Sequence, residues 1–343
     1  MLIGDVERAA LRLAGKVVRT PVLRLPVLDA AVGASVVLKA ETYQHTGAFK
    51  YRGALNKLLT LDPALVGRGV VAATSGNHGR AVARLAAERG IQALLVLPSD
   101  VPEAKLHAVR EHDANIVFYD PLKDDRDTIT AELSADRGLV PLPSSDDPDV
   151  AAGHGTVALE LFAQAGPLDQ LLVPVGGGGL AAGCATVAKT LCPDAKVIGV
   201  EPVDGDDTAQ SLRRGRHVSI APPRTIADGL RHQTPGRFTF EVNGKLLDGV
   251  EVVTDGEMAT AMRFLWEHAR IMAEPSGACA LAALLAGRLR PIGRRIGVVV
   301  SGGNITIERF RQIIDAGPET TCSSAEVQSI PSMAKDSPTD DAR

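Results

Sequence analysis

The sequence has few cysteines, and they stand far apart. Four occur in 343 residues, at Cys184, Cys192, Cys279 and Cys322, and no two form a Cys-x-x-Cys pair. This spacing excludes the common zinc motifs and a dense disulfide framework, both of which need clustered cysteines. We therefore expect small, buried thiols of the kind found in a reducing compartment.

An excess of positive charge and a long hydrophobic run are also absent. The net charge is −4 and the pI is about 6.1, and the basic cluster Arg213, Arg214 and Arg216 is too small to create a field that attracts nucleic acid. The apolar stretches are shorter than a membrane span, and no basic-then-apolar signal segment opens the chain. These absences predict a soluble, cytoplasmic protein that binds neither nucleic acid nor a membrane.

What the sequence does contain is an alternation of short β-branched runs with longer stretches rich in alanine and leucine. With 45% hydrophobic residues, the chain can build a core in each of two lobes. Buried parallel strands are predicted at residues 36–39, 69–73, 93–97, 115–119, 170–174, 196–200 and 296–300. Helices are predicted between them, at 79–89, 102–111, 125–136, 180–191, 255–268 and 276–286. The alternation predicts an α/β protein with right-handed crossovers.

Two glycine-containing segments follow predicted strands and open predicted helices. Residues 75–79 follow the strand at 69–73, and Gly176, Gly177, Gly178 and Gly179, the four-glycine loop, follow the strand at 170–174. Consecutive glycines weaken an ordinary element, but their backbone can curl around an anion with its N–H groups pointing inward. The loop therefore predicts a phosphate cradle. Neither a nucleoside-triphosphate loop nor a dinucleotide motif fits its spacing.

One lysine stands out in a chain that has few. Ten of the 37 basic residues are lysine, and Lys50 lies between Phe49 and Tyr51. A lysine amine can form an imine with a carbonyl, and its pKa falls readily on burial, unlike that of arginine. An imine-forming lysine, a phosphate cradle and polar side chains at other strand ends together predict a pyridoxal 5′-phosphate site.

Four segments resemble, in order, the signatures of the fold-type II pyridoxal-phosphate enzymes: residues 46–53, 75–79, 174–179 and 301–304. The sequence is most similar to the serine/threonine dehydratase and serine racemase branch. Cysteine synthases typically have threonine where this chain has His78, and threonine synthases usually have Phe-Lys-Asp where it has Phe49-Lys50-Tyr51. The resemblance implies two open twisted-sheet α/β lobes of the tryptophan synthase β type, with the cofactor in the cleft between them.

The resemblance also implies a division of the chain into domains. Residues 1–67 and 147–316 would form a large, discontinuous cofactor-binding domain, and residues 68–146 a small mobile domain that closes over the substrate. After Ala316 the composition shifts to Ser, Thr, Pro, Asp and Lys, which predicts a disordered tail at 317–343. A homodimer is expected from the resemblance alone.

Cofactor-binding roles follow residue by residue. Lys50 would hold the cofactor as a Schiff base and, once displaced by the substrate amine, take the Cα proton; Phe49 would pack nearby. Asn77 would bond the phenolic oxygen, the four-glycine loop the phosphate, and Ser301 the pyridine nitrogen. A hydroxyl at that nitrogen, unlike a carboxylate, does not force the ring to stay protonated, and this favours elimination.

Substrate-binding roles are predicted for Ser75, Asn77 and His78, at the substrate carboxylate. Arg126 is a more distant candidate, with a solvated helix start as the alternative because three aspartates surround it. In racemases of this branch, the serine matching Ser75 protonates the carbanion on the face opposite the lysine. Dehydratases often carry the same serine, so Ser75 permits racemisation without establishing it.

Four carboxylates cluster at residues 201–207, directly after a predicted strand. Oxygen ligands of this kind suit Mg²⁺, Ca²⁺ or Mn²⁺. The racemase branch has a divalent cation site with a similar Glu-Pro-x-x-x-x-Asp pattern, which implies Glu201, the carbonyl of Gly205 and Asp207 as ligands here. An acidic, solvated loop is the alternative.

The predicted function is β-elimination from a small β-hydroxy amino acid, such as L-threonine or L-serine, to a 2-oxo acid and ammonia. The alternatives are an amino-acid (serine) racemase and a 3-hydroxyaspartate ammonia-lyase. A β-replacement synthase is disfavoured by His78, and a non-catalytic binding protein by the intact Lys50. Residues 143–148 lack the aromatic often seen before Asp-Pro in dehydratases. The short remainder after residue 304 has no room for an isoleucine-feedback domain, so a catabolic, racemising or specialised role is expected.

Overall fold

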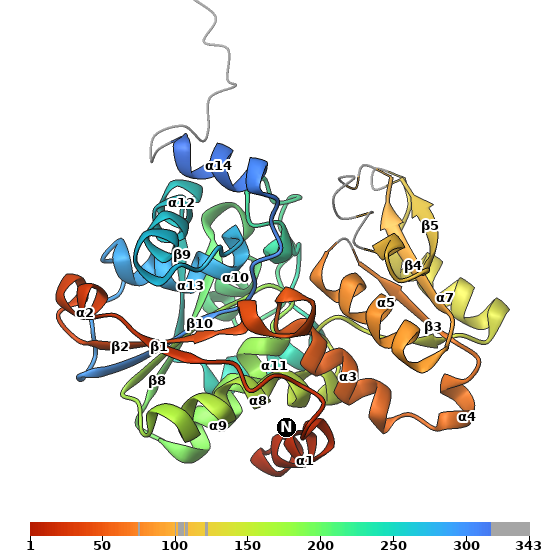
Figure 1. Ribbon diagram of the computed structural model, residues 1–343, viewed down its shortest axis with the longest axis horizontal. Coiled ribbons are helices and arrows are strands. Elements are labelled where there is room, and N and C mark those ends of the chain that lie inside the picture. Colours follow the sequence, from red (N-terminus) through yellow and green to blue (C-terminus); the bar gives the residue numbers. More distant parts are fainter. Residues whose placement is uncertain (75, 100, 102–105, 107–108, 121–122, 317–343) are drawn as a thin grey trace, which may run out of the picture.

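The computed structural model describes residues 1–74, 76–99, 101, 106, 109–120 and 123–316. Within this part the chain forms a six-stranded and a four-stranded sheet, each with helices packed on its faces (Figure 1). The predicted α/β class is therefore confirmed. The predicted tail at 317–343 and most of the predicted helix at 102–111 lie outside the described residues.

The six-stranded sheet has the order β1 (Val22–Arg24), β2 (Ser35–Ala40), β10 (Arg295–Val300), β7 (Gln170–Pro174), β8 (Lys196–Pro202) and β9 (Gly249–Val253). All neighbouring pairs are parallel except β1 with β2. In the register, Val298 lies opposite both Leu38 and Leu172. Successive side chains of a strand point to opposite faces, so a fully buried strand must be apolar on both. This explains why the central strands carry the β-branched runs of the sequence.

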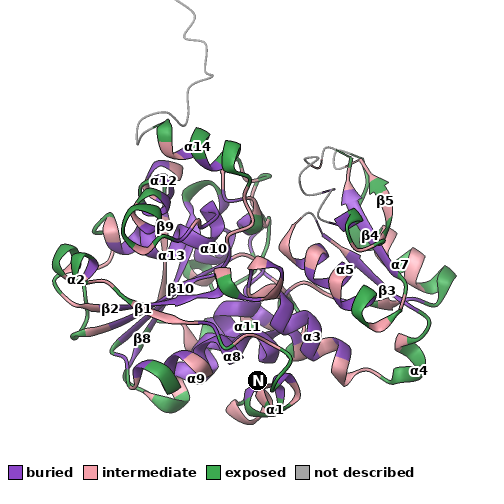
Figure 2. Ribbon diagram, in the orientation of Figure 1, coloured by how far each residue is buried: buried purple, intermediate pink, exposed green. Residues whose placement is uncertain are grey.

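Two layers of helices cover this sheet. Leu171 and Val173 pack with α1 (Ile3–Leu13), α8 (Pro148–Ala165) and α9 (Gly179–Leu191), whereas Leu172, between them, packs on the other face. The other face is covered by α2 (Pro26–Val32), α12 (Asp255–Phe264), α13 (Pro275–Leu285) and α14 (Ile307–Asp315). Further helices, α10 (Asp207–Arg214) and α11 (Arg237–Leu246), lie in the connection between β8 and β9. Figure 2 shows the buried interior of these layers and the exposed outer surfaces of α2 and α14.

The four-stranded sheet has the order β5 (Asn115–Tyr119), β4 (Ala93–Pro98), β3 (Val70–Ala73) and β6 (Val140–Pro141), and all its strands are parallel. One face packs on α3 (Lys50–Thr60) and α5 (Asn77–Arg89), and the other on α7 (Arg126–Arg137); a short helix, α4 (Pro63–Val66), joins α3 to β3. All its strands lie inside the predicted small domain, whose limits at 68 and 146 remain a prediction.

A buried ionic network fixes α3, the helix that begins at Lys50. Arg52 is fully buried, and its guanidinium contacts Glu41 through Nε at 2.8 Å and Glu160 through Nη1 at 2.7 Å. Lys39, also fully buried, donates to Glu160 at 2.6 Å. Charges removed from water persist only when they are paired and hydrogen-bonded, so the network ties α3 to α8 and to the segment after β2.

Within the part of the chain that the structure describes, no helix has both the length and the apolar composition needed to cross a membrane.

Candidate active site

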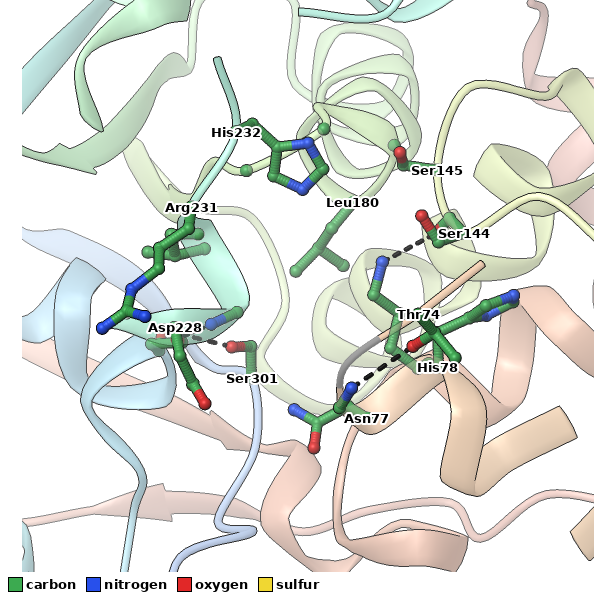
Figure 3. A pocket seen from close by; sticks show the side chains of 18 of the residues that line it. Thr74, Asn77, His78, Ser144, Ser145, Leu180, Asp228, Arg231, His232 and Ser301 are labelled. Carbon is green, nitrogen blue, oxygen red and sulfur yellow. Dashed lines mark hydrogen bonds between the residues drawn. The ribbon is translucent and has the colours of Figure 1, made fainter. Parts of the chain in front are cut away.

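A pocket opens where strands of both sheets end. Its wall includes Ala73 at the end of β3, Pro174 at the end of β7 and the four-glycine loop that follows, and Ser301 after β10. Phe49 and Lys50, at the start of α3, also line it. Figure 3 shows Thr74 and Ser301 in this wall. Parallel α/β sheets place ligands beyond the carboxyl ends of their strands. The pocket therefore brings residues of all four predicted segments together.

Lys50 lines this pocket. Its Nζ donates to the backbone oxygen of Ser144 at 2.6 Å and lies 5.1 Å from the centroid of the Phe49 ring. Burial lowers the pKa of the amine from 10.5 to about 8. An amine with a lowered pKa is unprotonated, and so nucleophilic, in a much larger fraction of molecules at neutral pH.

The segment before Lys50 is held by the loop after β10. Phe49 N–H donates to Ser301 O at 3.0 Å, Gly303 N–H donates to Gly47 O at 3.0 Å, and Ala48 forms a bridge with Gly302. The chain can turn here because Gly47 has a φ of 74°, in the left-handed region that glycine tolerates. Two motifs more than 250 residues apart in sequence thus form one backbone unit at the base of the pocket.

The four-glycine loop is a cradle with no room for side chains. A Cβ on Gly177 would collide with Ser145 and lie 3.0 Å from Cε1 of His232, and a Cβ on Gly178 would lie 2.7 Å from Nδ2 of Asn243. Gly178 also has a φ of 83° and caps α9, which begins at Gly179. The first N–H groups of a helix have no partner inside it and carry its positive dipole end. The loop therefore has a geometry that suits an anion, and its role as a phosphate cradle stays a prediction.

Asn77 is held firmly from two sides. Its Nδ2 donates to Oε1 of Glu274 at 2.6 Å, and its Oδ1 accepts from Nδ2 of Asn304 at 2.7 Å. Asn304 in turn donates to Thr46 O at 2.7 Å and accepts from Arg80 at 2.8 Å. One N–H of the Asn77 amide remains for a ligand, because an amide nitrogen carries two. Ser301, 3% exposed, donates to Ser276 O at 3.4 Å and also lines the pocket.

His78 has no N–H group left for a substrate carboxylate, the role that the sequence predicts for it. It is 3% exposed, and its Nε2 bonds the carbonyl oxygen of Leu142 at 2.9 Å. A carbonyl can only accept, so Nε2 carries the proton and Nδ1 is an acceptor. Burial, and then Lys50, lower the pKa of His78 to about 4. In this neutral form the ring has no second N–H for a substrate carboxylate, and that role stays a prediction.

The remaining predicted substrate residues differ in their placement. Ser75 lies outside the described residues. Arg126 is the first residue of α7 and also lines the pocket, so it is both a helix start and a pocket residue. Its Nε lies 3.6 Å from Oδ1 of Asp127, an exposed pair that holds the guanidinium weakly.

Other pocket residues were missed in the sequence: Ser144, Ser145, Asp228, Arg231, His232 and Glu274. Ser144 and Ser145 lie in the segment 143–148, which was compared with dehydratases only for its missing aromatic. The others belong to a connection and to a helix start, and the one signal for them is the polar stretch at residues 228–233, in the long connection between α10 and α11. Nothing in that stretch indicates which of its side chains reach the pocket.

The predicted cation ligands gather at the end of β8, outside the pocket. Glu201 is fully buried and accepts from the N–H groups of Thr208 at 3.2 Å and Ala209 at 2.9 Å. Asp207 is also fully buried, and neither of its carboxylate oxygens has a hydrogen-bond partner among the described residues. Burial, and then Asp207, hold the pKa of Glu201 well above its usual range, and burial raises that of Asp207 to about 7. No group of three or more His, Cys, Asp or Glu side chains suited to a metal occurs in the described part of the chain.

Comparisons with known proteins identify the family and its relatives. The sequence model of the family described as pyridoxal-phosphate dependent enzyme matches residues 13–302. An L-threo-3-hydroxyaspartate ammonia-lyase of Pseudomonas sp is 42% identical over 90% of this chain and 97% of its own. A serine racemase of Schizosaccharomyces pombe is 41% identical over 90% and 96%. The solved structure of maize serine racemase has a TM-score of 0.87 at 37% identity and covers 91% of this chain and 96% of its own.

Proposed function

Because the chain belongs to the family of pyridoxal-phosphate dependent enzymes, we propose that it removes water from a small β-hydroxy amino acid, such as L-threonine or L-serine, and releases a 2-oxo acid and ammonia. The observation that carries this proposal is the buried amine of Lys50, with a pKa of about 8, in the same pocket as the four-glycine loop. Relatives that match nine-tenths of the chain are named as ammonia-lyases and racemases.

The residues present fit pyridoxal phosphate. The four-glycine loop, which any Cβ would fill, would take the phosphate, and Lys50 the aldehyde carbon. Asn77 would bond the phenolic oxygen with its remaining N–H, Ser301 would meet the pyridine nitrogen, and Phe49 would pack nearby. When bound, the cofactor supplies an electron-withdrawing ring that stabilises negative charge at the substrate Cα.

Lys50 acts as the base in this proposal. Once the substrate has displaced it from the cofactor, its Nζ takes the Cα proton, and the carbonyl of Ser144, 2.6 Å away, holds the amine in place. A pKa of about 8 suits this work, because the amine is then partly free at neutral pH and still basic enough to accept a proton. The hydroxyl group on Cβ must receive a proton to leave as water.

A second candidate is elimination from 3-hydroxyaspartate, and a third is racemisation of serine. The first is supported by the 42% identical relative and by Arg126, a cation in the pocket wall that could pair with a second carboxylate. Racemisation is supported by the 41% identical relative, and it needs a proton donor opposite Lys50, the role expected of Ser75.

One assay separates the three. The purified protein is incubated with L-serine, D-serine, L-threonine and the threo and erythro forms of 3-hydroxyaspartate, and both 2-oxo acid and enantiomer composition are measured. We expect 2-oxo acid from at least one hydroxy amino acid, and none from the Lys50→Ala variant, which should also lose the visible absorbance of the bound cofactor. Absence of both products from every substrate would overturn the proposal.

A divalent cation at Glu201, the carbonyl of Gly205 and Asp207 is a separate proposal. It is supported by the two unpartnered, buried oxygens of Asp207, which an ion would satisfy. The site lies outside the pocket, so the ion would act on stability. We expect Mg²⁺ or Ca²⁺ to raise the thermal midpoint of EDTA-treated protein and Asp207→Asn to abolish the rise, with the exposed Asp204→Asn as the matched control. An unchanged midpoint with every cation would contradict the site.

We also propose a homodimer located in the cytoplasm. The dimer is supported only by the resemblance to the family, and light scattering on the purified protein tests it. A mass near 35.9 kDa, that of one chain, would contradict the dimer.

A further inference from the structure

His232 packs against the four-glycine loop, and the roles assigned above do not use it. It follows the short 3-10 helix η4 (Asp228–Leu230), and its N–H donates to Leu230 O at 2.9 Å. A Cβ on Gly176 would lie 3.1 Å from Cδ2 of His232, and one on Gly177 would lie 3.0 Å from Cε1. The imidazole therefore touches the part of the pocket that would hold a phosphate, and Figure 3 shows its ring pointing into the pocket.

The ring is available for a ligand. Neither of its nitrogens has a hydrogen-bond partner in the described part of the chain. Lys50 and Asn77, which line the same pocket, are both hydrogen-bonded. Lys50 from α3 and Arg126 from α7 act on it electrostatically, and Asp228 and Arg231 belong to its own segment. Burial, and then these two cations, lower its pKa to about 3.

A phosphate at the loop would reverse this situation. Two negative charges beside the imidazole favour its protonated form, and Lys50, which must be neutral to accept the Cα proton, then adds no opposing charge. Figure 3 shows His232 and Ser145 on one side of the pocket, and Ser301, Asp228 and Arg231 on the other. An N–H donor beside a phosphate forms one of the stronger hydrogen bonds in proteins.

We propose that His232 shares a proton with the phosphate bound at the four-glycine loop and that this proton goes to the leaving hydroxyl group of the substrate. The inference rests on the proposed function and adds the acid that the proposed function requires. A histidine is the side chain best suited to such a role, because it can carry or release a proton near neutral pH.

The step balances in protons and electrons. Lys50 Nζ would take the Cα proton, the electron pair of the broken Cα–H bond would form the Cα=Cβ double bond, and the Cβ–O bond would break with its electron pair on oxygen. That oxygen would take the proton that His232 holds against the phosphate. Water leaves, Lys50 holds one proton more, and the imidazole–phosphate pair holds one fewer. Exchange with solvent restores both groups before the next turnover.

A substrate whose leaving group needs no proton distinguishes an acid role of His232 from a role in packing alone. The hydroxy amino acid that the wild-type holoenzyme turns over best is compared with β-chloro-L-alanine, whose chloride leaves unprotonated. In His232→Gln we expect kcat/KM for the hydroxy substrate to fall about 100-fold, in line with the usual contribution of a general acid, and that for β-chloro-L-alanine to change less than about threefold. His217→Gln, an exposed histidine that packs on Phe240, is the matched control and should leave both values unchanged.

A second readout needs no turnover. The ³¹P resonance of the phosphate in the holoenzyme is expected to move in His232→Gln and to stay in place in His217→Gln. An unmoved resonance in His232→Gln overturns the contact with phosphate, and equal losses on the two substrates, or no loss on either, overturn the acid role.

If His232→Gln does not fold, His232→Ala provides a separate test. In His232→Ala, added imidazole should restore turnover of the hydroxy substrate and leave that of β-chloro-L-alanine unchanged, and absence of this recovery overturns the acid role. Wild-type protein that yields no 2-oxo acid from any hydroxy amino acid overturns the proposed function instead, so the two failures are distinguishable.

Discussion

At the scale of single residues, ionisable groups are buried both in the pocket and at the predicted cation site, where water cannot solvate their charge. The amine of Lys50 would be charged in water, but burial in the pocket lowers its pKa to about 8. Asp207 and Glu201 are two fully buried carboxylates with raised pKa values. Perturbed groups of this kind gather at functional sites, because reactivity and binding both use charge that is poorly solvated.

The lowered pKa of Lys50 predicts a pH-dependent gain in stability when the amine is removed. In cofactor-free protein, the folded-state pKa of about 8 lies below the ordinary value of 10.5, so between these values the unfolded chain binds more protons. The penalty is fully present below pH 8 and disappears as the pH rises to 10.5. We expect Lys50→Met to raise the urea midpoint at pH 7 by an amount that shrinks over this window. A gain of the same size at both ends would contradict the prediction.

Adding a single methyl group to the four-glycine loop should weaken cofactor binding. In Gly177→Ala the new Cβ would collide with Ser145 and press on His232, where the phosphate should sit. We expect the affinity for pyridoxal phosphate, measured by the visible absorbance, to fall at least about tenfold, equivalent to the loss of one charge-assisted hydrogen bond. Gly249→Ala is the control, because no atom lies within 4 Å of its Cβ position. Equal affinities for the two variants would refute the cradle.

Lys50 and the four glycines could be predicted from the sequence because each is an unusual residue choice with a local reason. His232, Ser145 and Glu274 could not, since serine, histidine and glutamate are common in connections. Their proximity to Lys50 depends on how α8, α9 and α13 pack. His78 shows a further limit: its position was predicted, but its N–H proved to be used by Leu142, a contact that only the fold creates.

At the scale of secondary structure, α3 matters most because it begins at Lys50 and is fixed two residues later by Arg52. The guanidinium bonds Glu41 and Glu160, which belong to η1 (Glu41–Tyr43) and α8. Any movement of α3 would break these buried pairs. The network therefore sets the position of the reactive amine relative to the six-stranded sheet.

Replacing Arg52 should consequently destabilise the whole protein. Arg52→Met leaves the fully buried Glu41 without its ion-pair partner and leaves Glu160 with Lys39 alone, and we expect a loss of about 3–5 kcal/mol in the free energy of unfolding. Arg84→Met removes a half-exposed pair with Glu88 at 2.7 Å on α5 and should cost less than about 1 kcal/mol. Urea unfolding of the cofactor-free proteins measures both. Similar losses for the two variants would show that burial does not determine the energetics.

The predicted strands are all found, whereas the 18-residue helix α8 and the shortest strands were not among the predicted elements. All seven predicted strands are present, whereas β1 and β6 have three and two residues and show no pattern to detect. The helix predicted at 255–268 ends at Phe264 and continues as the π-helical turn η5 (Leu265–Ala269), followed by Arg270 with a φ of 58°. Side-chain periodicity does not distinguish an α-helical from a π-helical turn, because the difference lies in backbone hydrogen bonds.

At the scale of the whole molecule, hydrogen bonds beside the pocket join α5, which packs on the four-stranded sheet, to segments next to the six-stranded sheet. Asn77 and Arg80 on α5 both bond Asn304, after β10, at 2.7 and 2.8 Å, and Asn77 also bonds Glu274, before α13. The beginning of α5 is thus tied to the large sheet. The edge strand β5 and its neighbour β4 lie away from this contact (Figure 1).

This arrangement predicts how residues 68–146, the predicted small domain, would close over the substrate. We expect substrate binding to rotate the four-stranded sheet as one body about the contact between Asn77 and Asn304, so that β5 moves farther than the start of α5. Crystal structures of the holoenzyme with and without an unreactive substrate analogue measure the rotation. The 2.7 Å bond should persist in both states, because it orients the amide that would hold the cofactor. In Asn304→Ala the pivot is lost, and we expect weaker cofactor binding together with variable lobe angles between crystal forms. A bound structure with unchanged sheets, or one in which this bond breaks on closure, would rule out the pivot.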